Sequence, residues 1–278
     1  MVQARLGTLP EVEELARVST WLAQKGWSEA GSGNLSIRLD PPPESLQAME
    51  PSLPQPLPLP VVGLSGCWLL ITSTGSRARE TAEAPEACSG IFRVLPDGEA
   101  MACVWGNAQV TSEVAAHLAV HQMLVDHRPE DRAVLHSHPA SLIALTHVTE
   151  LQDSLALSRA LLGMQSEANV RFPDGLRFLP YSPAGSVEIA TRTAQALEQA
   201  RLALWYAHGA IATGPTLSSA LDTLEYVDKM AQIYWLLRAA GEPAGGMRRE
   251  EIEASLEHFG LWDRHQQSLA ALRKASSR

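Results

Sequence analysis

The stretch AVLHSHPASLIALTH (133–147) places an apolar run, two histidines and a proline in succession. The apolar run predicts a buried strand, and Pro139 predicts the first turn of a helix that continues to His147. Residues two apart on a strand face the same side, so His136 and His138 would point one way where the strand ends. Such a pair is either two hydrogen-bonded strand-end histidines or two ligands of a divalent metal ion.

Strand and helix patterns alternate on both sides of this stretch. Ser186 and Thr216 stand where they could cap two of the expected helices. Apolar residues at helical spacing predict helices over 9–27, 111–127, 155–164, 186–200, 217–241 and 248–274. Alternating or continuous apolar runs predict strands within 34–39, 66–75, 90–106, 175–181 and 202–214, with a hairpin turn at Pro96-Asp97-Gly98.

These elements predict an α/β fold for the whole chain. We expect a single three-layer α/β/α domain over 1–278, built around a mixed, largely antiparallel central sheet with helices on both faces. The segment 40–60 is dense in proline, which excludes a helix interior or a central strand and predicts a surface excursion. The last part of the chain supplies C-terminal helices.

The composition excludes several classes of partner. The 278 residues are 45% hydrophobic with a net charge of −9, and no cluster of basic residues suggests binding to nucleic acid. No apolar run is long enough for a signal peptide or a membrane span. Cys67, Cys88 and Cys103 fit no CxxC pattern and are typical of thiols in a reducing compartment. We therefore expect a cytoplasmic protein with a small-molecule substrate.

A catalytic zinc site has three protein ligands and an open position. The third ligand could be His208, which follows an apolar strand in the stretch WYAHGAIATG and precedes a glycine that would allow a sharp turn. A histidine at such a place is also often structural. His117 and His121 lie four apart on an expected helix without an HExxH pattern, so we interpret them as helix-face residues.

One carboxylate and three small-residue loops complete the candidate site. Glu113 lies in the expected first turn of a helix. Either its carboxylate has only a favourable interaction with the helix dipole, or it acts as a base beside a metal. The turn that contains Thr111 and Ser112 could bind an anion together with the loops GSGNLS (31–36) and ITSTGSR (71–77). No nucleotide-binding glycine motif is present.

In order along the chain, the motifs GNLSIR, ITSTGS, TSE, HSHP and HG resemble those of the zinc-dependent class II aldolases of sugar phosphates. The resemblance covers nearly the whole chain. Within this family the rhamnulose-phosphate branch is the most similar, on the stretch SEANVRFPDGLRFLPYSPAGSVEIATRTAQAL, on HGAIATGPTLSSALDTLEYVDKMAQI and on the proline-rich excursion. The chain departs from that branch at Gly31, where an asparagine is expected, and at Ser76, where a lysine often stands.

The resemblance implies a class II aldolase fold and a role for each motif. His136, His138 and His208 would hold one Zn²⁺ per subunit, and Glu113 would reach the metal in the free enzyme and serve as catalytic acid and base. Glu167 would be a second catalytic acid that reaches the site of a neighbouring subunit. The residues that would bind the phosphate and the adjoining substrate atoms are Gly33, Asn34, Thr74, Gly75, Thr111 and Ser112.

The implied reaction is cleavage of a ketose 1-phosphate. The first candidate substrate is L-rhamnulose 1-phosphate, which would give dihydroxyacetone phosphate and L-lactaldehyde. The implied assembly is a homotetramer with active sites at subunit interfaces. The chain has only three lysines, all on or beside expected helices and away from the motifs, and zinc chemistry needs no Schiff-base lysine. The alternatives on this scaffold are a fuculose-phosphate aldolase, a ribulose-phosphate 4-epimerase, a methylthioribulose-1-phosphate dehydratase and a non-catalytic adducin-like interaction domain.

Overall fold

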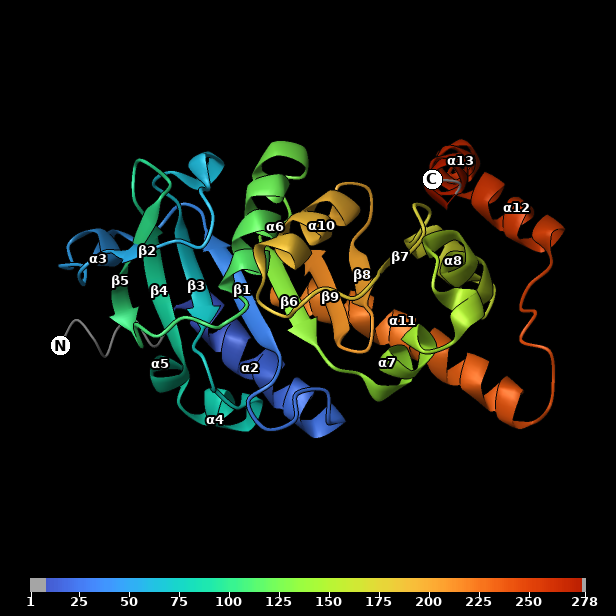
Figure 1. The fold of residues 1–278 in the computed structure, drawn as a ribbon, viewed down its shortest axis with the longest axis horizontal. Helices are drawn as coiled ribbons and strands as arrows, with labels where there is room; N and C mark the ends of the chain where they lie inside the picture. Colours follow the sequence, from blue (N-terminus) through green and yellow to red (C-terminus); the bar gives the residue numbers. More distant parts are fainter. Residues whose placement is uncertain (1–8, 277–278) are drawn as a thin grey trace. The chain divides into compact units, whose positions relative to one another are not determined.

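The computed structural model describes residues 9–276, and its centre is a nine-stranded sheet with helices on both faces (Figure 1). The strand order is β2-β5-β4-β3-β1-β6-β9-β8-β7. Neighbours from β2 to β6 pair antiparallel and β7 pairs parallel with β8, so the predicted mixed, largely antiparallel sheet is confirmed. The strands are β1 Asn34–Leu39, β2 Gln55–Pro56, β3 Trp68–Thr72, β4 Ser89–Val94, β5 Ala100–Gly106, β6 Ala133–Ser137, β7 Arg177–Leu179, β8 Leu202–Trp205 and β9 Gly209–Gly214.

The chain divides into two compact units. The first consists of the residues up to His138 together with Ser182–Glu198 and Ala212–Leu221, and the remaining residues form the second. Strand β9 and helix α11 each contain residues of both units. The single domain expected over 1–278 stays a prediction.

In the first unit, β1 separates two groups of helices. Ser36 and Asn34 of this strand bond to residues of α6, so Leu35 and Ile37 face the opposite side, where α2 lies (Figure 1). Helix α2 packs on α4, and α6 packs on α10. The helices of this unit are α2 Pro10–Lys25, α3 Glu44–Gln47, η1 Val62–Leu64, α4 Ala78–Glu83, α5 Pro85–Cys88, α6 Val114–His127 and α10 Val187–Leu197.

In the second unit, α13 packs on α8 and is joined to the loop before β7 by a two-pronged ion pair. Arg264 donates from Nε to Asp174 Oδ1 at 2.8 Å and from Nη2 to Asp174 Oδ2 at 2.5 Å. The helices of this unit are α7 Ala140–Thr146, η2 Thr149–Leu151, α8 Ser154–Leu162, α9 Ala168–Arg171, α12 Arg249–His258 and α13 Trp262–Ser276, and α11 Leu217–Ala239 continues into it from the first.

Local sequence signals are confirmed at several element ends. Ser186 Oγ accepts from Ile189 N at 3.2 Å at the start of α10, and Thr216 Oγ1 accepts from Ser219 N at 3.1 Å at the start of α11. The proline-rich segment 40–60 contains one helical turn, α3, and the short edge strand β2 beside β5, as proline requires. None of the helices among residues 9–276 is long and apolar enough to cross a membrane.

Candidate active site

His136 and His138 converge at the end of β6. His136 is fully buried and lies directly opposite Asn34 of β1, and its Nε2 is 3.0 Å from Nε2 of His138. On the other side of the His138 ring, Nδ1 is 3.0 Å from Glu29 Oε1. An N–H at Nδ1 donating to this carboxylate would make Nε2 the metal-binding atom of the ring, which is the usual arrangement of metal-binding histidines.

Glu29 is a site residue that the sequence analysis missed. Burial by itself raises the pKa of the Glu29 carboxyl, but the hydrogen bond and charge of His138 and the bonds from nearby backbone and Ser32 lower it below its ordinary value. Glu29 is thus a stable anion beside the ring. It precedes the glycine-rich loop by two residues, in a stretch that carries no motif.

His208 is presented by the tight turn between β8 and β9. His208 N donates to Trp205 O at 3.2 Å, and Ala207 N donates to Thr146 Oγ1 at 2.9 Å. The residue with left-handed backbone is Ala207, with a φ of 54°, whereas Gly209 does not adopt a positive φ. The sharp turn expected from glycine is therefore made one residue before the histidine.

The donor set fits a divalent metal. One ligand atom from each of His136, His138 and His208 lies within 4.8 Å of the others, the one such group of histidine, cysteine or acidic residues among residues 9–276. Neutral imidazoles are good ligands for zinc, and three of them leave a coordination position for substrate. The chain therefore contains a three-histidine group that could hold a metal ion.

Glu113 faces the same histidine pair. It is the N-cap residue of α6, one position before the helix instead of inside its first turn, and its side chain makes no capping bond. Its Oε2 instead accepts from Asn34 Nδ2 at 2.7 Å and lies 3.3 Å from His136 Nε2. Since Glu113 is only 7% exposed, the carboxylate is directed at β1 and β6 and not at water.

The glycine-rich loop before β1 requires a glycine at position 33. Gly33 has a φ of 75°, and a Cβ there would lie 2.6 Å from Ser28 Oγ and 3.1 Å from His136 O. A residue with a side chain would be strained at this positive φ and would press on Ser28 and on the backbone of His136. A crevice beside this loop is lined by the hydroxyl-bearing residues Ser28, Ser32 and Ser76 and by Asn34.

The loop after β3 comes close to the first loop. A Cβ on Gly31 would lie 3.1 Å from Gly75 O, so the two loops nearly touch at this position. Thr74 and Gly75 are exposed, and Thr74 N donates to Gln109 O at 3.0 Å. The buried hydroxyl of Ser73 has no hydrogen-bond partner among the described residues and could receive a substrate oxygen.

The TSE turn lies next to these loops in the fold. Thr111 N donates to Thr72 O at 3.1 Å, and Thr111 Oγ1 accepts from Glu113 N at 3.3 Å. Ser112 is exposed. The first unit thus carries both loops and the turn that were predicted to bind the substrate.

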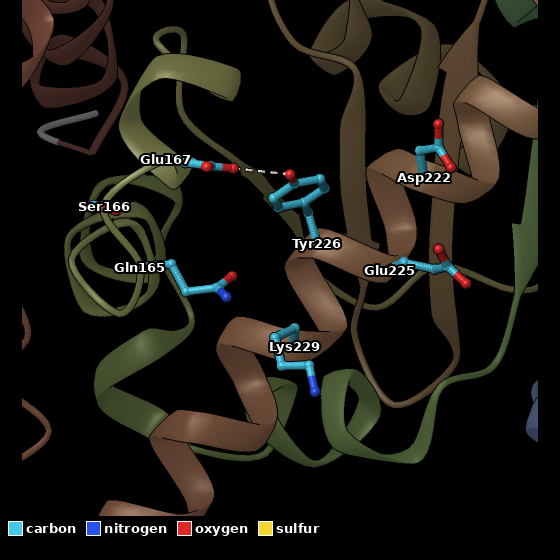
Figure 2. A pocket seen from close by; sticks show the side chains of 7 residues that line it. All are labelled: Gln165, Ser166, Glu167, Asp222, Glu225, Tyr226 and Lys229. Atoms are coloured by element: carbon cyan, nitrogen blue, oxygen red, sulfur yellow. Dashed lines mark hydrogen bonds between the residues drawn. The ribbon is translucent and has the colours of Figure 1, made fainter.

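Glu167 lies in the second unit at the start of α9. It is exposed, and its Oε2 accepts a hydrogen bond from Tyr226 Oη at 3.0 Å. Figure 2 shows this hydrogen bond, with Tyr226 on α11 reaching toward Glu167. The two residues line a cavity of about 450 Å³. The cavity is lined by Gln165, Ser166, Glu167, Asp222, Glu225, Tyr226 and Lys229.

His117 and His121 lie on the face of α6 that bonds to Ser36 of β1, and both are fully buried. Burial lowers the pKa of His117 to about 3, against the attraction of Glu113 and with the repulsion of His136. Burial, His117 and Arg38 lower the pKa of His121 well below its ordinary value. Both rings are therefore neutral at physiological pH.

From the lowered pKa of these two histidines, we predict that the folded protein loses stability in mild acid. Their pKa is lower in the folded than in the unfolded protein, so their contribution is complete above the ordinary histidine pKa of about 6.5 and is lost as the pH falls. Because of the lowered pKa of His117 alone, we expect the free energy of unfolding to be about 2 kcal/mol lower at pH 5 than at pH 7.5. Urea unfolding of the metal-free protein at both pH values measures this difference.

The matched variants are His117→Gln, which should weaken the pH dependence, and His127→Gln on the exposed end of the same helix, which should not. A free energy of unfolding that is equal at pH 7.5 and pH 5 would contradict the prediction.

The fold and site together define an α/β protein with a three-histidine group that could hold a metal ion beside a buried carboxylate. The family model for the class II aldolase and adducin N-terminal domain matches residues 13–235. A rhamnulose-1-phosphate aldolase from Escherichia fergusonii is 33% identical over 255 residues, 88% of this chain and 91% of that protein. A rhamnulose-1-phosphate aldolase from Listeria monocytogenes is 29% identical, over 90% of this chain and 93% of that protein.

Among solved structures, a sugar-phosphate aldolase from Thermotoga maritima has a TM-score of 0.76 and 33% identity, over 84% of this chain and 98% of that chain. The chain therefore belongs to the class II aldolase family, and the resemblance inferred from its motifs is confirmed. It is an enzyme of the aldolase class, a carbon–carbon lyase.

Proposed function

We propose that this aldolase uses zinc to cleave L-rhamnulose 1-phosphate to dihydroxyacetone phosphate and L-lactaldehyde. The observation that carries the choice of substrate is the 33% identity to a rhamnulose-1-phosphate aldolase over 88% of this chain. The three-histidine group and the buried Glu113 beside it support metal-dependent chemistry.

His136, His138 and His208 are the proposed ligands, with Glu113 as an additional ligand in the free enzyme. Zn²⁺ held there would stabilise, as a Lewis acid, the negative charge that develops on the three-carbon phosphate. Glu113 takes the substrate hydroxyl proton and returns a proton to carbon, for which its position beside the histidine pair is suited. The two loops and the turn bind the phosphate and its neighbouring oxygens through Gly33, Asn34, Thr74, Gly75, Thr111 and Ser112.

A second candidate substrate is another ketose 1-phosphate, such as L-fuculose 1-phosphate. The observation that favours it is the contact at Gly31, where the loop of Gly75 occupies the space that a side chain would need. Gly31 has no side chain, and the Ser76 hydroxyl donates to Cys88 O at 2.9 Å. The site therefore lacks two polar groups that a rhamnulose-phosphate site would use.

The test is the release of dihydroxyacetone phosphate by the zinc-loaded protein from L-rhamnulose 1-phosphate and L-fuculose 1-phosphate, measured by a coupled NADH assay. The proposal expects kcat/KM to be higher for the first sugar. A higher value for the second would select the alternative. Product analysis by NMR with methylthioribulose 1-phosphate and L-ribulose 5-phosphate detects a dehydratase or an epimerase, either of which would refute the proposal.

We further propose a cytoplasmic homotetramer in which Glu167 reaches the active site of a neighbouring subunit. Glu167→Ala is then expected to lower kcat about 10²- to 10⁴-fold without dissociating the assembly, as expected for loss of one catalytic proton-transfer group. Steady-state kinetics and light scattering measure the two effects. Tyr226→Phe, which removes only the hydrogen bond to Glu167, is the control and should have a smaller effect. Unchanged turnover of Glu167→Ala would exclude the role.

A further inference from the structure

Strand β1 and helix α6 meet along a seam of polar side chains inside the first unit. Two strand residues advance about 6.6 Å and four helix residues about 6 Å, so every second residue of β1 can face every fourth residue of α6. All six side chains lie in residues that are at most 7% exposed. The strand supplies Asn34, Ser36 and Arg38, and the helix, with its cap, supplies Glu113, His117 and His121.

Five of these residues form a continuous hydrogen-bonded chain. Asn34 Nδ2 donates to Glu113 Oε2 at 2.7 Å, and Asn34 Oδ1 is 2.5 Å from His117 Nε2. The other ring nitrogen of His117, Nδ1, is 2.6 Å from Ser36 Oγ, which is in turn 2.7 Å from His121 Nε2. This hydrogen-bonded series thus runs from the buried ring of His121 to the carboxylate of Glu113, the proposed acid and base.

Only one direction of donation satisfies every bond in this chain. An ionised Glu113 can only accept, so Asn34 must turn its NH₂ toward it and its oxygen toward His117. That oxygen needs an N–H, which fixes His117 as the neutral Nε2–H tautomer with a bare Nδ1. The Ser36 hydroxyl then donates to His117 and accepts from His121 Nε2–H.

Two further observations agree with this direction. Both histidines are kept neutral by burial, which lowers the pKa of each below its ordinary value. His121 Nδ1 is buried and has no hydrogen-bond partner among the described residues, as a bare acceptor can be, whereas a buried N–H without a partner is rare.

We propose that His117, aligned by Ser36 and His121, is a positioning residue that locks the Asn34 amide with its NH₂ toward Glu113. This inference rests on the proposed function, in which Glu113 moves the proton. Without a donor from His117, the Asn34 oxygen is left buried without its partner, and the amide is no longer held in the position that serves Glu113. Glu113 then loses a hydrogen bond inside a buried site and moves out of line with the substrate.

The test compares His117→Leu, which keeps bulk but no donor, with His117→Gln, whose amide N–H can replace Nε2–H. We expect His117→Leu to lower kcat about 10- to 100-fold, the range for one hydrogen bond to a charged group, with KM changed less than threefold. His117→Gln should stay within about fivefold of the wild type. His127→Gln, at the exposed end of α6, is the matched control and should be unchanged.

Equal loss in the leucine and glutamine variants would assign His117 a packing role and overturn the proposal, as would a rise in KM at constant kcat. Circular dichroism and zinc analysis show that each variant is folded and loaded. If His117→Leu does not fold, Ser36→Ala takes its place, because it frees the His117 ring without touching Asn34; it should lower kcat about three- to tenfold.

A readout independent of activity separates this inference from the proposed function. Long-range ¹H–¹⁵N spectra of histidine-labelled protein at pH 7 report the tautomer of each ring. Neutral Nε2–H forms of His117 and His121 are expected even if no ketose phosphate is cleaved. A charged ring or an Nδ1–H form of His117 would overturn the proposal, whereas an inactive wild type with the expected tautomers would refute only the proposed function.

Discussion

Replacing Glu113 with glutamine is expected to lower kcat for ketose-phosphate cleavage by about 10²- to 10⁴-fold, the range for loss of a positioned acid–base group. The substitution keeps the size of the side chain and its ability to accept from Asn34 Nδ2, but an amide cannot take up the substrate proton. Glu113 is 7% exposed, and its Oε2 lies 3.3 Å from His136 Nε2. No nearby residue of α6 carries a carboxylate that could replace it.

The measurement is steady-state cleavage together with the zinc content of the purified variant. Zinc should remain bound, because the three imidazoles do not depend on Glu113. Glu44→Gln, on the exposed turn of the proline-rich segment, is the control and should behave as the wild type. Wild-type turnover in Glu113→Gln would remove this residue from the mechanism, and loss of zinc would make it chiefly a ligand.

The fold could be predicted well from local patterns because most elements carry one. Residues 133–137 form β6, Pro139 precedes α7, and the caps at Ser186 and Thr216 are present. The two-residue period of a strand predicts that His136 and His138 face the same side, and their Nε2 atoms lie 3.0 Å apart although β6 ends at Ser137.

The interior connections of the site could not be predicted. Helix α6 is packed against the sheet and against α10, so nine of its residues are buried and no polar face marks the position of His117. Its bond to Asn34 joins residues 83 apart, and that of His138 to Glu29 joins residues 109 apart. Such pairs depend on the strand order and register, which a single sequence does not specify.

Removing the metal is expected to abolish cleavage, with a loss of at least about 10³-fold, and added Zn²⁺ should restore it. The reason is that this chemistry requires a positive centre for the developing charge, and the three lysines that could otherwise form a Schiff base, Lys25, Lys229 and Lys274, lie on helices α2, α11 and α13. Dialysis against dipicolinate, followed by elemental analysis and the dihydroxyacetone phosphate assay, measures both quantities on one sample.

The ligand set makes the prediction specific to three residues. His136→Ala, His138→Ala and His208→Ala should each lower the zinc content below one per subunit and lower turnover, because two imidazoles bind zinc much more weakly than three. His258→Ala, on the exposed end of α12, is the control and should keep both. Full zinc content in His208→Ala would remove that residue from the ligand set. Undiminished turnover in protein shown to be metal-free would refute metal-dependent cleavage.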